Sequence, residues 1–212
     1  MQHPEAGAPI RILTVDDHPV LREGVASMIQ AEADMELVAE AEGGAEAVRQ
    51  FRLFKPDVTL MDLQMPGMSG LEAIQAIRSE FNDARIIVLT TYTGDVQVLQ
   101  ALKAGAAGYL LKSSLRTELL NAIRVVHLGR KHLPAAVANE LAQHFGAAPL
   151  SEREMQVLKR VAAGNSNRQV AAQLNISEDT VKAHMKSILL KLDANDRTHA
   201  VTIALRRGII DI

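Results

Sequence analysis

Five short apolar runs alternate with helical segments over the first part of the chain, and this alternation restricts the fold more than any other feature. Buried strands are typically short, continuous and rich in β-branched residues. Three runs fit that description well, namely Ile10–Val15, Asp57–Leu63 and Arg85–Thr90. Met35–Ala39 and Gly108–Leu111 are shorter candidates for the same role.

Apolar residues recur at helical spacing in the segments between these runs. The predicted helices are Val20–Ala31, Ala45–Phe54, Leu71–Ser79, Val96–Ala104 and Leu115–His127. Strands that alternate with helices favour a parallel sheet, because right-handed crossovers place helices on both of its faces. We therefore predict a doubly wound α/β domain with a five-stranded parallel sheet over residues 9–128.

The strand signal ends near Leu128. Residues 129–148 are predicted to be an interdomain linker. It begins with Gly129, ends near Gly146 and Pro149, and contains a helix from Pro134 to Phe145. Proline suits the first turn of a helix, where its missing N–H costs nothing. Residues 149–212 are entirely helical in pattern and are predicted to form a small all-α domain.

Charge and composition limit the kind of protein. Residues 149–212 carry ten Lys and Arg against seven Asp and Glu, a net charge of +3, whereas residues 1–148 carry 13 against 18, a net charge of -5. A weakly basic domain is compatible with nucleic acid.

The absence of Cys excludes disulfides and thiolate metal sites. Met1–Pro9 lacks the features of a signal peptide, and no apolar run approaches the roughly 20 residues of a membrane helix. We therefore expect a cytoplasmic protein.

Polar residues follow four of the five predicted strands. Asp16 and Asp17 follow the first strand, Asp62 lies on the third, Thr90 ends the fourth and Lys112 follows the fifth. Ligands of open α/β sheets bind at the carboxyl ends of the strands, which share one edge. The sequence therefore predicts that three carboxylates, a hydroxyl and an ammonium meet there.

This set of groups suits phosphoryl chemistry. Clustered carboxylates stay ionised only when a cation joins them, and oxygen ligands suit Mg²⁺. A carboxylate beside the metal can act as a nucleophile and form an aspartyl phosphate, while Lys112 neutralises the phosphoryl oxygens. Each residue alone has an ordinary alternative, because an Asp at a strand end usually caps a helix or forms a turn. Their joint placement favours the ligand site.

The segments around these residues resemble the receiver domains of bacterial response regulators, which have a flavodoxin-like fold. The matching segments are Val15–Pro19, Pro56–Gly70, Leu89–Thr90 and Gly108–Lys112, in the expected order. The resemblance implies that a sensor histidine kinase phosphorylates Asp62. It also implies that Asp16, Asp17, Asp62 and the backbone carbonyl of Gln64 hold Mg²⁺, that Lys112 contacts the phosphoryl group, and that Thr90 and Tyr109 form a switch pair. For Tyr109 the alternative is an ordinary buried edge residue.

The helical domain carries three start signals. Ser151 and Glu154 form a capping box, and Gly164 is the expected end of that helix. Asn167 is the expected cap of a second helix, Arg168 to Leu174, and Ser177 that of a third.

The third helix has two faces. Val181, Met185, Ile188 and Leu192 form a buried stripe, whereas Lys182, Ala183, Lys186 and Ser187 are expected to face outward. Lysines can meet phosphates, and a small Ala permits close approach to base edges. Taken alone, such a helix is usually just a solvated surface, and His184 fits equally well as a partly buried core residue.

The segments of this domain resemble the LuxR-type DNA-binding domain, and the whole chain is similar to the NarL/FixJ family. The matching segments are Leu150–Glu154, Gly164–Arg168, Ile176–His184, Lys191–Leu192 and Arg197–Val201. The resemblance implies contacts to double-stranded DNA from Lys182, Ala183, His184 and Lys186. It also implies a homodimer through the last helix, where Ala200, Val201 and Ala204 form a small apolar patch, although packing within the domain is the alternative. Gln169 stands where an acidic residue is frequent in the family.

We predict a transcription regulator switched by phosphorylation, not an enzyme, with RNA polymerase as a further candidate partner. One alternative is a Mg²⁺-dependent phosphatase that passes through an aspartyl phosphate. Such enzymes require a nucleophilic Asp on the first strand and a second Asp two residues later. In this chain the two Asp residues at the end of the first strand, Asp16 and Asp17, are adjacent. Another alternative is a DNA-binding protein whose receiver serves only for dimerisation, and the complete acidic pocket counts against it.

Overall fold

The computed structural model describes residues 8–91, 95–143 and 148–210. The chain divides into two compact units. Of the described residues, the first unit contains residues 8–91 and 98–135, which form the α/β fold, and the second contains residues 95–97 and those from 136 onward, which include the C-terminal helices.

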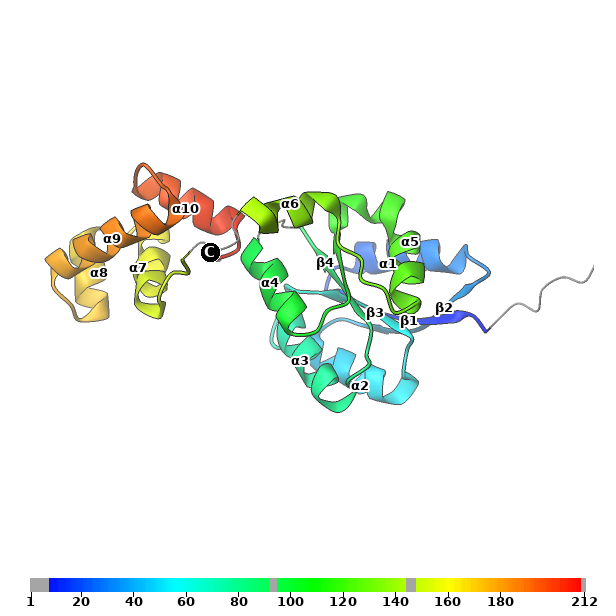
Figure 1. Ribbon diagram of the computed structural model, residues 1–212. Helices are drawn as coiled ribbons and strands as arrows, with labels where there is room; N and C mark the ends of the chain where they lie inside the picture. The colour runs from blue at the N-terminus through cyan, green and yellow to red at the C-terminus, as the bar shows by residue number, and fades with distance from the viewer. Residues whose placement is uncertain (1–7, 92–94, 144–147, 211–212) are drawn as a thin grey trace, which may run out of the picture. The chain divides into compact units, whose positions relative to one another are not determined.

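The α/β unit contains the predicted five-stranded parallel sheet (Figure 1). Its strands are β1 (Ile10–Val15), β2 (Met35–Ala41), β3 (Val58–Asp62), β4 (Ile86–Thr90) and β5 (Gly108–Leu111). The spatial order is β2-β1-β3-β4-β5, and all neighbouring strands pair in parallel. The chain therefore winds first to one side of β1 and then to the other. This reversal opens a crevice beyond the carboxyl ends of β1 and β3, where open sheets of this kind bind ligands.

Helices cover both faces of the sheet. They are α1 (Pro19–Gln30), α2 (Gly44–Phe54), α3 (Gly70–Glu80), α4 (Asp95–Lys103) and α5 (Leu115–His127), the last preceded by a 3₁₀ turn at Lys112–Ser114. Helices α1 and α5 pack on one face, with Val25, Ile29 and Ile123 in a core shared with the strands. Helices α2 and α3 pack on the other side of the sheet (Figure 1). Burial on both faces explains why the strands are continuously apolar.

The beginning of the predicted linker is hydrogen-bonded to the edge of the sheet. The backbone N–H of His132 donates to the Ala107 carbonyl at 3.1 Å, and the N–H of Tyr109 donates to the His132 carbonyl at 2.9 Å. The predicted helix follows as α6 (Ala135–Gln143). Its predicted end at Phe145, and Gly146, lie outside the described residues.

The second unit contains α7 (Glu152–Ala162), α8 (Asn167–Leu174), α9 (Glu178–Leu192) and α10 (Arg197–Arg206). One apolar cluster joins all four helices, with Leu158, Val170 and Ile188 fully buried. Gly164 follows α7 with φ of +83°, as its predicted role as a helix end requires.

The predicted cap of α8 was wrong by one residue. Ser166, not Asn167, accepts a hydrogen bond from the Gln169 N–H, and the Gln169 side chain accepts one from the Ser166 N–H at 2.7 Å. This reciprocal capping box makes Asn167 the first helical residue. It also gives Gln169 a local role at the position where the family often has an acidic side chain.

Candidate functional sites

The predicted acidic residues converge at the carboxyl ends of β1 and β3. Asp16 and Asp62 are almost fully buried, with exposures of 1% and 3%. The Lys112 ammonium lies between them, with Nζ 2.7 Å from Asp16 Oδ2 and 2.8 Å from Asp62 Oδ2. The loop after β3 is fixed by a bond from the Gln64 N–H to Asp62 Oδ1 at 3.2 Å.

The pocket has more negative than positive charge, which favours the binding of a further cation. Burial raises the pKa of Asp62, Lys112 lowers it, and the nearby Asp16 carboxylate raises it, so that the net direction is upward. Burial alone would lower the pKa of Lys112, but its bonds to Asp16 and Asp62 outweigh this and raise the pKa. One ammonium therefore stays charged beside two carboxylates that it does not fully neutralise.

Two neighbouring side chains extend the cluster. Ligand atoms of Asp16, Asp17, His18 and Asp62 all lie within 4.8 Å of one another. His18 Nδ1 lies 2.8 Å from Asp17 Oδ1 and 3.1 Å from Asp16 Oδ1. His18 is the N-cap residue of α1, but its side chain makes no capping bond and lies beside the two carboxylates instead.

Thr90 and Tyr109 lie together inside the sheet. Both side chains are buried, Thr90 at the end of β4 and Tyr109 on the adjacent β5. Burial raises the pKa of Tyr109 to about 12, while a hydrogen bond with Thr90 acts in the opposite direction. In this structure, therefore, the Tyr109 ring is turned inward and touches the residue with which it is expected to switch.

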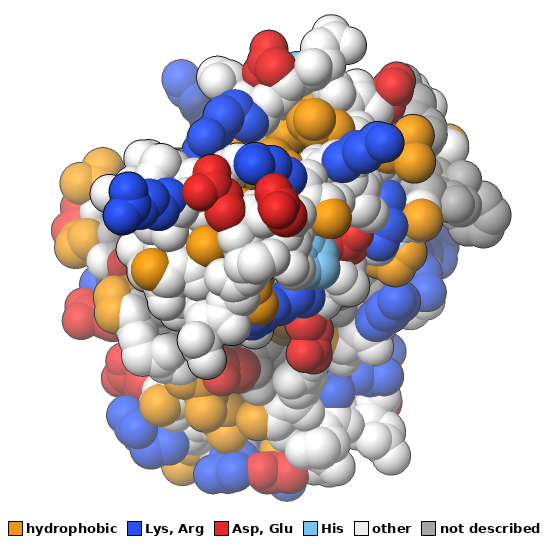
Figure 2. Space-filling model, turned by 90° about the vertical axis from the view of Figure 1, so that its left-hand side faces the viewer, with side chains coloured by type: hydrophobic (Ala, Val, Ile, Leu, Met, Phe, Trp, Pro, Cys, Tyr) orange, Lys and Arg blue, Asp and Glu red, His pale blue; other side chains and the backbone are white. Residues whose placement is uncertain are grey.

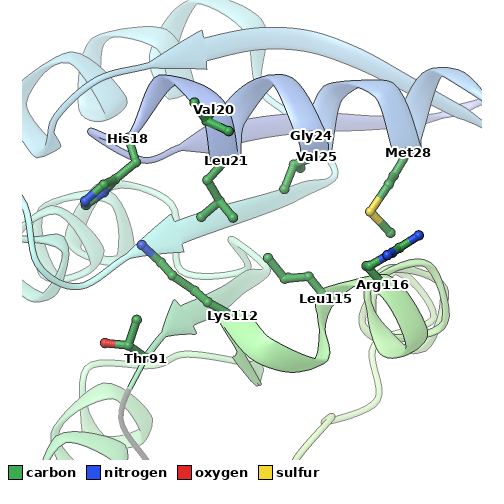
Figure 3. A pocket seen from close by; sticks show the side chains of 10 residues that line it. All are labelled: His18, Val20, Leu21, Gly24, Val25, Met28, Thr91, Lys112, Leu115 and Arg116. Carbon is green, nitrogen blue, oxygen red and sulfur yellow. The ribbon is translucent and has the colours of Figure 1, made fainter.

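A groove opens beside the acidic pocket, between α1 and α5 (Figure 3). Its volume is about 590 Å³. His18, Thr91 and Lys112 lie at the end nearest the carboxylates, and apolar side chains line most of the rest. Val20 on α1 is 83% exposed, an unusual state for a large apolar side chain at the edge of a groove.

The predicted two-faced pattern of α9 is largely present. Val181, Met185, Ile188 and Leu192 are buried, whereas Lys182, Ala183 and Lys186 are exposed and His184 is half-buried. Lys182 pairs with Asp179 one turn earlier, at 3.0 Å. Figure 2 shows one face of the molecule, on which Lys and Arg side chains lie with acidic side chains among them.

Ser187 does not face outward as predicted. Its hydroxyl donates to Glu154 Oε1 at 2.6 Å, because Glu154 is buried directly beneath α9. Lys191 Nζ lies 2.7 Å from Glu154 Oε2, and the Ser151 N–H donates to the same oxygen at 2.6 Å. Burial alone would raise the pKa of Glu154, but the bonds from Lys191, Ser187 and Ser151 lower it to about 2. Sequence patterns predicted only the capping role of Glu154, because Ser187 and Lys191 are distant along the chain.

The predicted apolar patch on α10 is not exposed. Ala200 and Ala204 are fully buried in the helical core, and Val201 is half-buried against it. Small side chains at these positions allow α10 to pack closely on α7 and α9. Packing within the domain, the alternative reading of the sequence, accounts for Ala200 and Ala204.

Comparison with known proteins identifies both units. Residues 12–124 match the response regulator receiver domain, and residues 148–204 match the luxR family of bacterial regulatory proteins. The nitrate/nitrite response regulator NarP of Escherichia coli is 41% identical over 211 residues, which are 96% of this chain and 98% of NarP. The chain belongs to the NarL/FixJ family of response regulators.

Two further relatives of this response regulator are informative. The transcriptional regulatory protein LiaR of Bacillus subtilis is 40% identical over 210 residues, which cover 95% of this chain and all of LiaR. RcsB of Salmonella enterica, solved bound to a promoter in the presence of a phosphomimetic, aligns with a TM-score of 0.72 and 26% identity over 94% of this chain and 98% of RcsB. RcsB has also been solved as two dimers on two parallel DNAs. Among the described residues of the response regulator, no helix has the length and apolar character required to span a bilayer.

Proposed function

We propose that a histidine kinase phosphorylates this response regulator on Asp62 and that phosphorylation controls its sequence-specific DNA binding and transcription. The observation that carries the proposal is the Lys112 ammonium between the buried carboxylates of Asp16 and Asp62, at 2.7 and 2.8 Å. A carboxylate oxygen of Asp62 attacks the phosphorus of a phosphohistidine. The P–N bond breaks, a P–O bond forms, and the imidazole leaves with the electron pair.

The residues present fit a magnesium ion. Asp16, Asp17 and Asp62 offer carboxylate oxygens within 4.8 Å of one another, the ligand type that Mg²⁺ prefers. We assign these three side chains and the backbone carbonyl of Gln64 as its ligands; the ion supplies positive charge for the oxygens of the transferred group. Lys112 holds a phosphoryl oxygen, and the Thr90 hydroxyl moves toward the phosphoryl group with Tyr109 following.

The groove between α1 and α5 offers the kinase a path to Asp62. Asp62 is only 3% exposed. Lys112, which lies 2.8 Å from it, lines the groove together with His18 and Thr91, so we expect a donor histidine to approach from that side. Exposed Val20 and the apolar lining of the groove give a partner helix a surface to bury beside the donor.

In the helical unit we assign the DNA contacts to α9. Lys182 and Lys186 are exposed one turn apart and suit phosphates, and Ala183 between them allows a base edge to approach. His184 completes the set. RcsB, which this chain resembles, binds a promoter with a phosphomimetic present and forms dimers on DNA. We infer that this chain acts as a homodimer on DNA, with RNA polymerase as a further candidate partner.

Intact-mass spectrometry tests the phosphorylation step. The wild type, Asp62→Ala and Asp83→Ala are incubated with Mg²⁺ and acetyl phosphate; Asp83 is an exposed carboxylate that serves as the matched control. We expect one phosphoryl group on the wild type and on Asp83→Ala, and none on Asp62→Ala. Uptake by Asp62→Ala would overturn the assignment of the acceptor. Steady release of phosphate at the rate of an enzyme would instead support the phosphatase alternative.

A DNA-binding measurement tests the coupling. The affinity of the wild type for duplex DNA is compared with and without the phosphodonor, and again for Asp62→Ala. We expect the donor to raise the affinity of the wild type only. Equal affinity in all four samples would favour the alternative in which the receiver serves only for dimerisation.

A further inference from the structure

Arg22, on the first turns of α1, is a largely buried cation outside the set of residues assigned above. Its side chain is only 12% exposed, and arginine is seldom buried to this degree without partners. Nη1 donates to the backbone carbonyl of Asp16 at 2.7 Å. Nη2 lies 2.6 Å from Glu42 Oε1, and Nε lies 3.5 Å from Glu40 Oε2.

The carbonyl that Arg22 holds belongs to the peptide group between Asp16 and Asp17. This group is planar, so fixing its oxygen fixes the orientation of the whole plane. The N–H of Asp16 is already bound to the Ala41 carbonyl at 3.2 Å. With the Asp16 carbonyl also held, the direction in which the backbone enters Asp17 is set, which restricts the positions that the Asp17 carboxylate can reach.

The charge of Arg22 is balanced on its far side. Glu40, near the end of β2, and Glu42, just after it, face the guanidinium. The cation of Arg22 therefore does not add an uncompensated positive charge beside a site that must bind another cation. The planar fork of Arg can bind a carbonyl and a carboxylate together, whereas a Lys ammonium on a flexible stem lacks this fixed geometry.

We propose that Arg22 is a positioning residue for the magnesium ion, which it aids by holding the Asp16–Asp17 peptide so that the Asp17 carboxylate points into the acidic pocket. This role rests on the proposed function, since it requires the pocket to bind Mg²⁺. A merely structural role, in which Arg22 only ties α1 to the end of β2, would change stability and leave the affinity for Mg²⁺ unchanged.

Isothermal titration of Mg²⁺ into the full-length protein distinguishes the two roles. The samples are the wild type, Arg22→Ala, Arg22→Lys and Arg52→Ala. Arg52 on α2 binds Glu80, with Nε 2.8 Å from Oε2, and is a matched control in which a helix surface loses a comparable ion pair. Groups that orient metal ligands typically contribute at least tenfold to affinity, so we expect Arg22→Ala to raise the Mg²⁺ dissociation constant by about tenfold. Arg22→Lys should lie between the wild type and Arg22→Ala, and Arg52→Ala should match the wild type.

The phosphorylation rate gives a second readout. With acetyl phosphate as donor, Arg22→Ala should need about tenfold more Mg²⁺ for half-maximal rate, while its rate at saturating Mg²⁺ stays close to that of the wild type. An unchanged dissociation constant in Arg22→Ala, beside a wild type that binds Mg²⁺ and is phosphorylated, would overturn the positioning role alone. A wild type that binds no Mg²⁺ would overturn the proposed function, and this role with it.

A milder variant keeps the test decisive if Arg22→Ala does not fold. Glu42→Gln leaves the Arg22 guanidinium in place and weakens its interaction with residue 42, where Nη2 lies 2.6 Å from Oε1 in the wild type. We expect a smaller rise in the Mg²⁺ dissociation constant in the same direction. A value equal to that of Arg52→Ala would overturn the proposal.

Discussion

Lys112 forms ion pairs with two buried carboxylates of the receiver pocket. Its ammonium is the positive charge that the structure places between the buried carboxylates of Asp16 and Asp62. Removing one partner from a buried ionic cluster lowers the free energy of unfolding, because the remaining charges are shielded from water and no longer have an opposite charge to compensate them. Stability and cation binding should therefore be linked at this residue.

We predict that Lys112→Met lowers the free energy of unfolding by about 3 kcal/mol in the presence of a chelator. Excess Mg²⁺ should restore part of this loss, because a dication replaces the missing charge. Urea unfolding with and without Mg²⁺ measures both effects. Lys103→Met, which removes an exposed lysine from α4, is the control and should show neither. A Lys112→Met protein as stable as the wild type without Mg²⁺ would show that the carboxylates do not need the ammonium.

Glycine is required at the start of α3, where the helix approaches the end of the strand that carries Asp62. Gly70 begins α3, directly after the loop that follows β3, and a Cβ at this position would overlap the Asp62 carbonyl oxygen. That oxygen belongs to the backbone and cannot rotate away, so the loop itself would have to move.

We therefore predict that Gly70→Ala lowers the free energy of unfolding by about 2 kcal/mol or more and slows phosphoryl uptake at Asp62. Gly24→Ala is the control, since a Cβ on Gly24 meets nothing within 4 Å. It should stabilise α1 by roughly 0.5–1 kcal/mol, as Ala is the better helix former. Thermal unfolding followed by circular dichroism measures both variants. Equal melting temperatures for the two would contradict the proposed clash.

At the scale of elements, the ion pair between α7 and α9 makes the helical domain sensitive to acid. Glu154 has its pKa lowered from 4.5 to about 2, against the effect of burial, by Lys191, Ser187 and Ser151. Because the folded pKa lies below the unfolded one, the carboxylate stabilises the fold at pH values above about 4.5. This contribution is lost as the pH falls from about 4.5 to about 2.

We expect Glu154→Gln to cost about 2–3 kcal/mol of unfolding free energy at neutral pH, and progressively less toward pH 3. Denaturant unfolding of the wild type and the variant across this range gives the difference directly. Glu152→Gln changes an exposed residue of the same helical turn and should show no such trend. If the difference in unfolding free energy between Glu154→Gln and the wild type stayed constant with pH, the lowered pKa of Glu154 would not be the source of this stability.

At the scale of the whole molecule, the receiver unit contains the site for phosphoryl chemistry and the helical unit contains the helix assigned to DNA binding. The receiver offers the acidic pocket, and the helical unit offers the exposed lysines of α9. Each phosphate contact releases counterions from the duplex, so affinity should fall steeply with salt.

We predict that Lys186→Ala lowers the affinity for a mixed-sequence DNA duplex and reduces the slope of log affinity against log salt by about 1. Fluorescence anisotropy at several salt concentrations measures the slope. Lys103→Ala in the receiver is the control and should keep the wild-type slope. A Lys186→Ala protein with the wild-type slope would remove this lysine from the phosphate contacts.

The sequence by itself determined the sheet, its helices and the acidic members of the pocket, although not His18 beside them. Strand and helix periods are local signals, and parallel strands bring their carboxyl ends to one edge whatever the details of packing. For that reason Asp16, Asp62 and Lys112, whose ammonium lies within 2.8 Å of both carboxylates in the structure, could be placed together before any distance was known. Local signals also located the buried stripe of α9, although they misplaced the cap of α8 by one residue.

Only the tertiary structure decided which side chains hold these elements in place. Arg22 reaches the Asp16 carbonyl and Glu42, and Ser187 turns inward to Glu154. Ala200 and Ala204, which looked like a surface patch, are buried in the helical core. Each of these facts depends on how close residues distant in sequence come to one another. A periodic pattern shows which face of a helix is apolar, but not which neighbour covers that face or which polar group finds a partner there.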